Sequence, residues 1–130
     1  MKYSIAVYGG PYSHQATHTA YHFAQAVLAK GHNIQRVFFY HDGVYNASAL
    51  VAPPQDESKL PKQWQTLAQD NSFELVVCIA AAVRRGILDE NEAKRYSKPA
   101  ANLEDNYQLS GLGQLVDAGL ESDRLISFGP

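Results

Sequence analysis

The feature that most limits how this chain can fold is a regular alternation of short apolar segments with longer helix-forming ones. Strands are expected at residues 3–8, 34–40, 73–77 and 123–128, with a fifth between 100 and 109. Helices are expected at 14–30, 58–70 and 110–121, and shorter ones at 79–86 and 89–95. Such alternation predicts an α/β fold, a flavodoxin-like three-layer sandwich whose parallel sheet of four to five strands is flanked by helices. In that strand order, segment 3–8 lies between 34–40 and 73–77.

Size and charge restrict the class of protein. The 130 residues predict a single domain, 1–130, with a formal net charge of −2. That charge gives no basic surface for direct contact with nucleic acid. The apolar run at 3–8 is too short for a signal peptide or a membrane span. A single cysteine excludes a disulfide framework and fits a reducing compartment, so we expect a soluble cytoplasmic domain.

Cys78, the single cysteine, stands where the apolar segment 73–77 meets the small residues 80–82. A strand is expected to end there and a helix to begin. The unpaired N–H groups of a first helical turn favour a thiolate, so Cys78 is a candidate nucleophile. The alternative is a buried packing residue, because free cysteine is among the most buried residue types.

Several known cysteine sites do not fit the residues around Cys78. Arg84 completes a Cys-x5-Arg spacing, but the residues between favour a helix over a phosphate-binding loop. A nucleophile elbow needs glycine two residues before and after the nucleophile, where this chain has Val76 and Ala80. A Cys-x-x-Cys redox pair needs a second cysteine. Phosphatase, hydrolase and dithiol chemistry are therefore all disfavoured.

Histidines give weaker signals. His14, His18 and His22 share one helix face opposite the apolar one, which predicts a solvent or subunit-facing stripe and not a metal site. His41 follows a strand, but the expected order puts it about 10 Å from Cys78, so a loop-anchoring role is favoured over that of a base. No phosphate-loop pattern is present, and no cofactor is expected.

A lone thiol suits the transfer of sulfur as a persulfide. A second thiol can attack the outer sulfur of Cys–S–SH and carry it away, or attack the inner sulfur and expel sulfide. A chain without another cysteine has no internal route for that second reaction. Ala81 and Ala82 would leave room for a large partner to reach Cys78.

Read together, several short motifs resemble the TusD/DsrE family of small sulfur-relay proteins over essentially the whole chain. They are residues 37–40, 43–46, Cys78 with 80–82, 84–86, 89–90 with 92–93, and 109–113. The resemblance implies that Cys78 is the active cysteine, which accepts a sulfane sulfur from an upstream persulfide donor protein and passes it to a cysteine of a downstream carrier. It also implies a heterohexamer with two smaller homologous subunits, each present in two copies.

Two branches of the family are compatible with the sequence. Residues 43–46 favour the TusD branch, in which the sulfur reaches the 2-thiouridine of wobble-position tRNA, whereas residues 53–56 are closer to the DsrE branch of sulfur oxidation. Arg84 and Arg85 are secondary candidates for steadying a persulfide, although solvated helix-end arginines explain them better. The competing hypotheses are a non-catalytic assembly subunit and a small-molecule-binding module. The relay hypothesis expects the Cys78 sulfur to lie open at the rim of the sheet.

Overall fold

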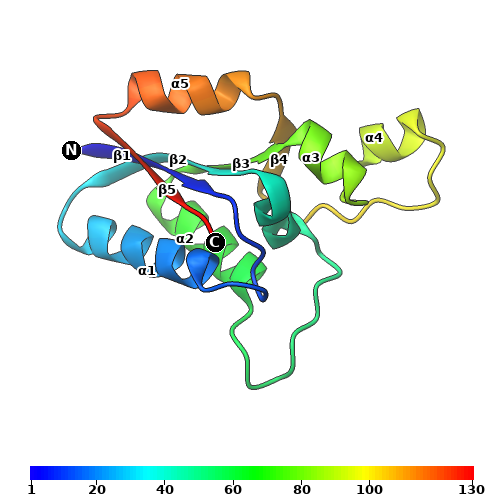
Figure 1. Ribbon diagram of the computed structural model, residues 1–130, viewed down its shortest axis with the longest axis horizontal. Helices are drawn as coiled ribbons and strands as arrows, with labels where there is room; N and C mark the ends of the chain where they lie inside the picture. Colours follow the sequence, from blue (N-terminus) through cyan, green and yellow to red (C-terminus); the bar gives the residue numbers. More distant parts are fainter.

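A computed structural model describes residues 1–130 as one parallel sheet with helices on both faces (Figure 1). The sheet has five strands in the order β4-β3-β2-β1-β5, and every neighbouring pair is parallel. The strands are β1 (Lys2–Val7), β2 (Asn33–Phe39), β3 (Glu74–Cys78), β4 (Tyr107–Ser110) and β5 (Arg124–Phe128). The α/β class and the parallel sheet flanked by helices are confirmed.

The helices divide between the two faces and the carboxyl end of the sheet (Figure 1). They are α1 (Ala16–Ala29), η1 (His41–Ala47), α2 (Leu60–Asn71), α3 (Ile79–Arg84), α4 (Glu90–Arg95) and α5 (Gly113–Glu121). Helices α1 and α2 cover one face, α5 lies alone across the other, and η1, α3 and α4 gather where the strands end.

The strand order that we predicted is wrong. β2 lies directly beside β3, and β1 lies on the far side of β2, next to β5. Strands β1 to β4 therefore follow one another across the sheet, and the chain then crosses back over it through α5. Strands covered on both faces all read as apolar runs, so their order is not encoded in their composition.

Most predicted elements are confirmed to within a few residues, including a fifth strand within residues 100–109. The exception is the last helix, which begins at Gly113, because Ser110 is the final residue of β4. Residues 41–47, where no helix is expected, form the 3-10 helix η1. Gly31 and Gly86, which follow α1 and α3, have φ angles of 85° and 77°, a left-handed backbone that glycine adopts at little cost.

The main core lies between the sheet and the α1–α2 layer. Trp64 of α2 is fully buried, and its ring meets those of Phe39 and Tyr21 edge-on at 5.7 and 5.2 Å. Tyr107 of β4 extends this cluster, and its hydroxyl donates a hydrogen bond of 2.8 Å to the carbonyl of Pro61. Burial raises the pKa of Tyr107 well above its ordinary value of 10.0. This packing fixes β3 between β2 and β4, and so fixes the strand end that carries Cys78.

Candidate functional site

Cys78 occupies the junction that the sequence predicts. It is the last residue of β3, pairs with Ser110 of β4, and is also the N-cap residue of α3. Its backbone is extended, with φ −61° and ψ 117°, so the chain turns from strand to helix at this residue. The sulfur-bearing residue therefore stands at the carboxyl edge of the sheet, where α/β folds generally place their chemistry.

The sulfur is not open at this edge, which corrects our expectation of an accessible thiol. The whole residue is only 2% exposed and belongs to the hydrophobic core. Two contacts explain its burial: Ser110 lies beside it in the sheet, and η1 packs against both β3 and α3. The sequence places η1 in a loop, and so gave no sign that this segment folds back over the end of β3.

A surface hollow is lined by the two residues that follow Cys78 in the chain. It is a surface depression of about 390 Å³ between α3 and α4, lined by Ile79, Ala80, Val83, Arg84, Glu92, Arg95 and Tyr96. Ile79 and Ala80 follow Cys78 directly in the chain. A partner seated in this hollow would therefore stand against the first turn of α3, next to Cys78 in the chain.

The two arginines at the end of α3 have different surroundings. Arg85 donates a hydrogen bond of 2.9 Å to the Asp42 carboxylate and another of 3.1 Å to the carbonyl of Ala81. It thereby ties the end of α3 to η1. Arg84 is exposed, makes no ion pair, and lines the hollow together with Arg95. Arg84 is thus the arginine that remains free to meet an anionic group.

His41 opens η1 just after β2, and β2 is adjacent to β3, which carries Cys78. The expected separation of two strand spacings was therefore wrong. The His41 ring stacks on Tyr40, with 4.4 Å between centroids, and meets Tyr8 edge-on at 6.0 Å. Its φ of 49° is unusual for a residue with a side chain. This aromatic packing fits a loop-anchoring role and gives His41 no hydrogen bond to the sulfur.

The three histidines of the expected stripe lie on α1 and in the segment just before it. His14 and His18 line a polar hollow of about 490 Å³ with Asp56 and Glu57, whereas His22 is exposed on the next turn of α1. No group of three or more metal-ligating side chains is close enough together to hold a metal ion. None of the helices has both the length and the apolar character needed to cross a lipid bilayer.

One buried ionic cluster has no counterpart in our sequence analysis. Arg36 of β2 is 6% exposed and bonds to Glu74 and Asp117 at 2.6 and 3.2 Å. An arginine inside the apolar run Ile34–Phe39 is the signal that could have revealed it, because a buried charge requires partners. The cluster joins β2, β3 and α5 and lies at the opposite end of β3 from Cys78.

Comparisons with known proteins agree over the full chain. The sequence model of the DsrE/DsrF-like family matches residues 1–128. A protein of Allochromatium vinosum named "Putative sulfurtransferase DsrE" is 52% identical, covering 99% of both chains. "Sulfurtransferase TusD" of Serratia proteamaculans is 51% identical, covering 98% of this chain and 99% of that protein. The crystal structure of the ychN protein from E. coli shares the fold with a TM-score of 0.78 at 17% identity, covering 98% of this chain and 99% of that one.

Proposed function

This chain belongs to the DsrE/DsrF-like family, and from that premise we propose that it is a sulfurtransferase subunit of a sulfur-relay complex with Cys78 as its persulfide carrier. Relatives whose sequences are 52% and 51% identical to this chain are named sulfurtransferases, which supports the transferase role. The observation that carries the choice of residue is the position of Cys78, the single thiol, at the junction of β3 and α3.

The proposed transfer is a balanced exchange that needs no outside oxidant. The Cys78 thiolate attacks the outer sulfur of a donor's Cys–S–SH, a new S–S bond forms on Cys78, and the donor leaves as a thiolate. In the second step the thiolate of an acceptor cysteine attacks the outer sulfur on Cys78 and restores the Cys78 thiolate. Because the chain has no second cysteine, its own thiols cannot discharge the persulfide as sulfide.

Burial adds a condition to this mechanism. At 2% exposure the sulfur cannot meet another protein in the closed conformation, so each transfer requires a local opening at the carboxyl edge. α3 has only six residues and follows Cys78 directly, so we propose that its displacement away from η1 is the opening that exposes the sulfur. Arg84, which lines the hollow between α3 and α4, would then lie near the anionic persulfide.

We propose the wider context on the strength of the family. The upstream partner is a persulfide donor protein and the downstream partner a carrier protein with an acceptor cysteine. The working form is a cytoplasmic heterohexamer with two smaller homologous subunits. The sulfur is destined for 2-thiouridine in tRNA, with cytoplasmic sulfur oxidation as the alternative. Identities of 51% to a TusD and 52% to a DsrE do not separate the two branches.

The burial of Cys78 favours a second candidate, a non-catalytic assembly subunit in which this cysteine only packs. The deciding experiment incubates the full chain and its Cys78→Ser variant with a protein persulfide donor and measures intact masses. The relay function predicts a gain of one sulfur atom on the parent chain, reversed by a thiol reductant, and no gain on Cys78→Ser. A folded parent chain that takes up no sulfur, or a Ser variant that takes up as much, would refute the assignment.

A further inference from the structure

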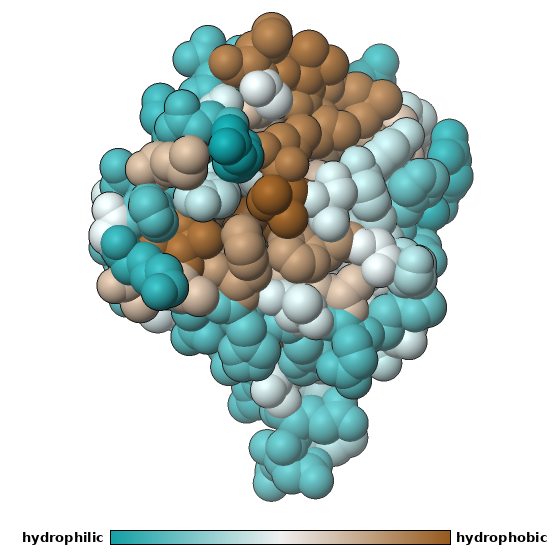
Figure 2. All heavy atoms as spheres, turned by 60° about the vertical axis from the view of Figure 1, so that its left-hand side comes forward, coloured by the Kyte–Doolittle hydropathy of each residue, from teal (hydrophilic) through white to brown (hydrophobic).

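Helix α5 presents apolar side chains to solvent. Leu112, Val116 and Leu120 are 46%, 63% and 79% exposed. They recur every fourth residue from the residue before α5 to its last turn, so they form one stripe along its outer side. Figure 2 shows apolar side chains gathered at the top of the molecule, where α5 lies in Figure 1. We call these three residues the α5 stripe.

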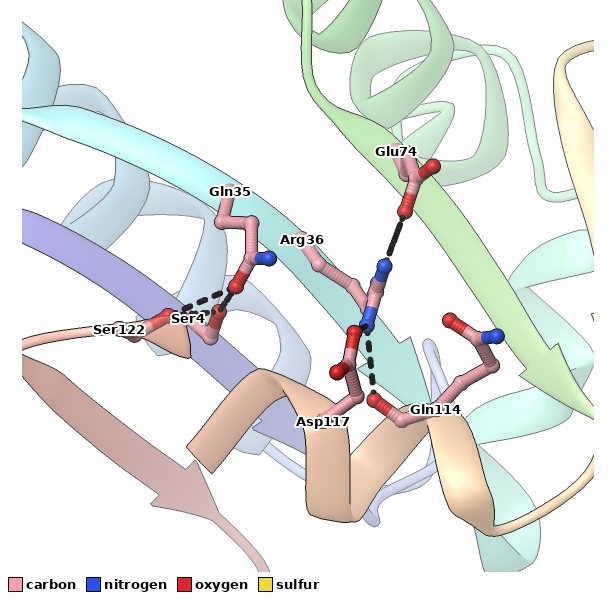
Figure 3. Close-up of polar contacts among 7 residues, drawn as sticks. All are labelled: Ser4, Gln35, Arg36, Glu74, Gln114, Asp117 and Ser122. Atoms are coloured by element: carbon pink, nitrogen blue, oxygen red, sulfur yellow. Dashed lines mark hydrogen bonds and ion pairs between the residues drawn. The ribbon is translucent and has the colours of Figure 1, made fainter. Parts of the chain in front are cut away.

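The inner side of α5 combines apolar and polar contacts, since Leu115 packs against the core beside an ion pair with the sheet. Arg36 donates hydrogen bonds to the carbonyl of Gln114 at 2.9 Å and to the carboxylate of Asp117 at 3.2 Å (Figure 3). Ala118 is the one buried residue of the helix. Leu115, Ala118 and the ion pair thus hold α5 to the sheet, while the apolar side chains of the stripe are left exposed.

Two glycines flank the α5 stripe, and the fold itself does not require them. A Cβ atom at Gly113 would meet nothing within 4 Å, and one at Gly119 only Leu125 at an ordinary 3.7 Å. Neither has a left-handed φ. Gly119 lies in the interior of α5, where glycine costs about 1 kcal/mol relative to alanine, whereas Gly113 is the first residue of the helix. Glycines beside an apolar stripe allow another helix to approach closely, and such an approach gives these two a role.

The stripe and its glycines are symmetric about Val116. Glycine lies three residues to each side, at 113 and 119, and leucine four residues to each side, at 112 and 120. Two such helices can pack antiparallel about a twofold axis at Val116. Leu112 of one helix then meets Leu120 of the other, and Gly113 meets Gly119. A twofold contact requires this reciprocity, whereas a contact with a different partner does not.

We infer that the α5 stripe packs antiparallel against the same stripe of a second copy of this chain, with Val116 on the twofold axis. Asp117 and Glu121 lie about 100° or more around the helix from Val116, so the contact brings no like charges together. The inference rests on α5 alone and does not depend on the sulfur chemistry.

The contact is small. Nine helical residues span about 13 Å, whereas a stable interface covers about 800 Å² on each partner. Leu125 of β5, which is 37% exposed and packs beside Gly119, enlarges the apolar surface. The isolated chain should therefore dimerise weakly, at high protein concentration, and the same contact would strengthen any larger assembly that contains two copies.

Cysteine cross-linking tests the register of this contact. In a Cys78→Ser background, Val116→Cys should oxidise to a covalent homodimer, because a residue on the axis meets its own mate. Leu112→Cys and Leu120→Cys should each stay monomeric, since eight residues of helix hold identical positions about 12 Å apart, beyond disulfide reach. An equimolar mixture of those two variants should cross-link.

Glu121→Cys, exposed on the other side of the same helix, is the matched control. The inference is overturned if Val116→Cys cross-links no faster than Glu121→Cys, or if the mixture of position 112 and 120 variants gives no heterodimer. A second variant needs no oxidation: Val116→Lys should abolish the concentration-dependent mass increase of the parent chain in sedimentation equilibrium without lowering Tm. Unchanged self-association of Val116→Lys would also overturn it.

Discussion

Gly43 lies where η1 passes over the end of β1, and the backbone there leaves no room for a side chain. A Cβ atom at Gly43 would overlap the carbonyl oxygen of Val7, which is backbone and cannot rotate away. The amide of Tyr40 already donates a hydrogen bond of 2.9 Å to that same oxygen. Gly43 thus lets η1 approach β1 and β2 closely enough to cover the end of the sheet.

Gly43→Ala should therefore destabilise the fold by about 3 kcal/mol, as overpacking a fixed backbone site does. Urea unfolding followed by circular dichroism would measure the change. Gly111→Ala is the matched control, because a Cβ atom there meets nothing within 4 Å, and it should change stability by less than about 0.5 kcal/mol. Equal midpoints for the two variants would contradict this account of Gly43.

At the same scale, the sequence located Cys78 correctly but not its exposure. The residue order around it, an apolar strand followed by small residues, is enough to place it at a strand end. Its burial depends on η1, which reaches β3 only because β2 lies next to it. That neighbour relation is a property of the tertiary fold, and no pattern within residues 73–84 reports it.

Among the elements, α5 is attached to the sheet partly through a buried polar cluster. Arg36, at 7% side-chain exposure, has two carboxylate partners that are each about half exposed, Glu74 and Asp117. Together with the carbonyl of Gln114, they satisfy its guanidinium. Below α5, Ser122 and Ser4 share hydrogen bonds with Gln35 and hold the helix end (Figure 3). Polar contacts therefore carry much of the docking of α5.

Asp117→Asn should loosen α5 without unfolding the sheet. It removes one of two opposing charges on Arg36, and because Asp117 is half exposed the loss should be about 1 kcal/mol or less. Hydrogen exchange should quicken in residues 113–121 and stay unchanged in β1 to β3. Glu121→Gln removes a charge from the same helix without an ion pair and should leave exchange unchanged. Equal hydrogen-exchange rates in residues 113–121 of the two variants would contradict the prediction.

The sequence patterns predicted the positions of helices and strands better than any other property of the fold. Asp89 caps α4 by accepting a hydrogen bond of 2.9 Å from the amide of Glu92, as its place before a helical segment indicates. The order of the strands was not predictable in this way, because the neighbouring strands β1, β2 and β3 all end in buried apolar residues that look alike in the sequence. The exposed apolar stripe of α5 was hidden too, since the side of the helix that faces the sheet also carries Asp117, whose partner Arg36 lies on a distant strand.

For the whole molecule, the central question is how a buried sulfur reaches another protein. Two routes exist: a local opening at the carboxyl edge, or unfolding of the entire domain. They differ in the surface that they expose, and the slope of free energy against denaturant scales with that surface. α3 is short and belongs to the edge, whereas α2 carries the fully buried Trp64 of the main core.

We expect Cys78 to be alkylated through the local route. Its labelling rate in the native protein should barely change with low concentrations of urea, because displacing α3 exposes little surface. Labelling that required global unfolding would instead rise with a slope of about 1–3 kcal/mol per molar urea. Ala68→Cys in a Cys78→Ser background provides the global reference, since Ala68 is 1% exposed in α2. If Cys78 and the position 68 cysteine share one urea slope, the sulfur is reached only by unfolding, and a relay role for the folded chain is untenable.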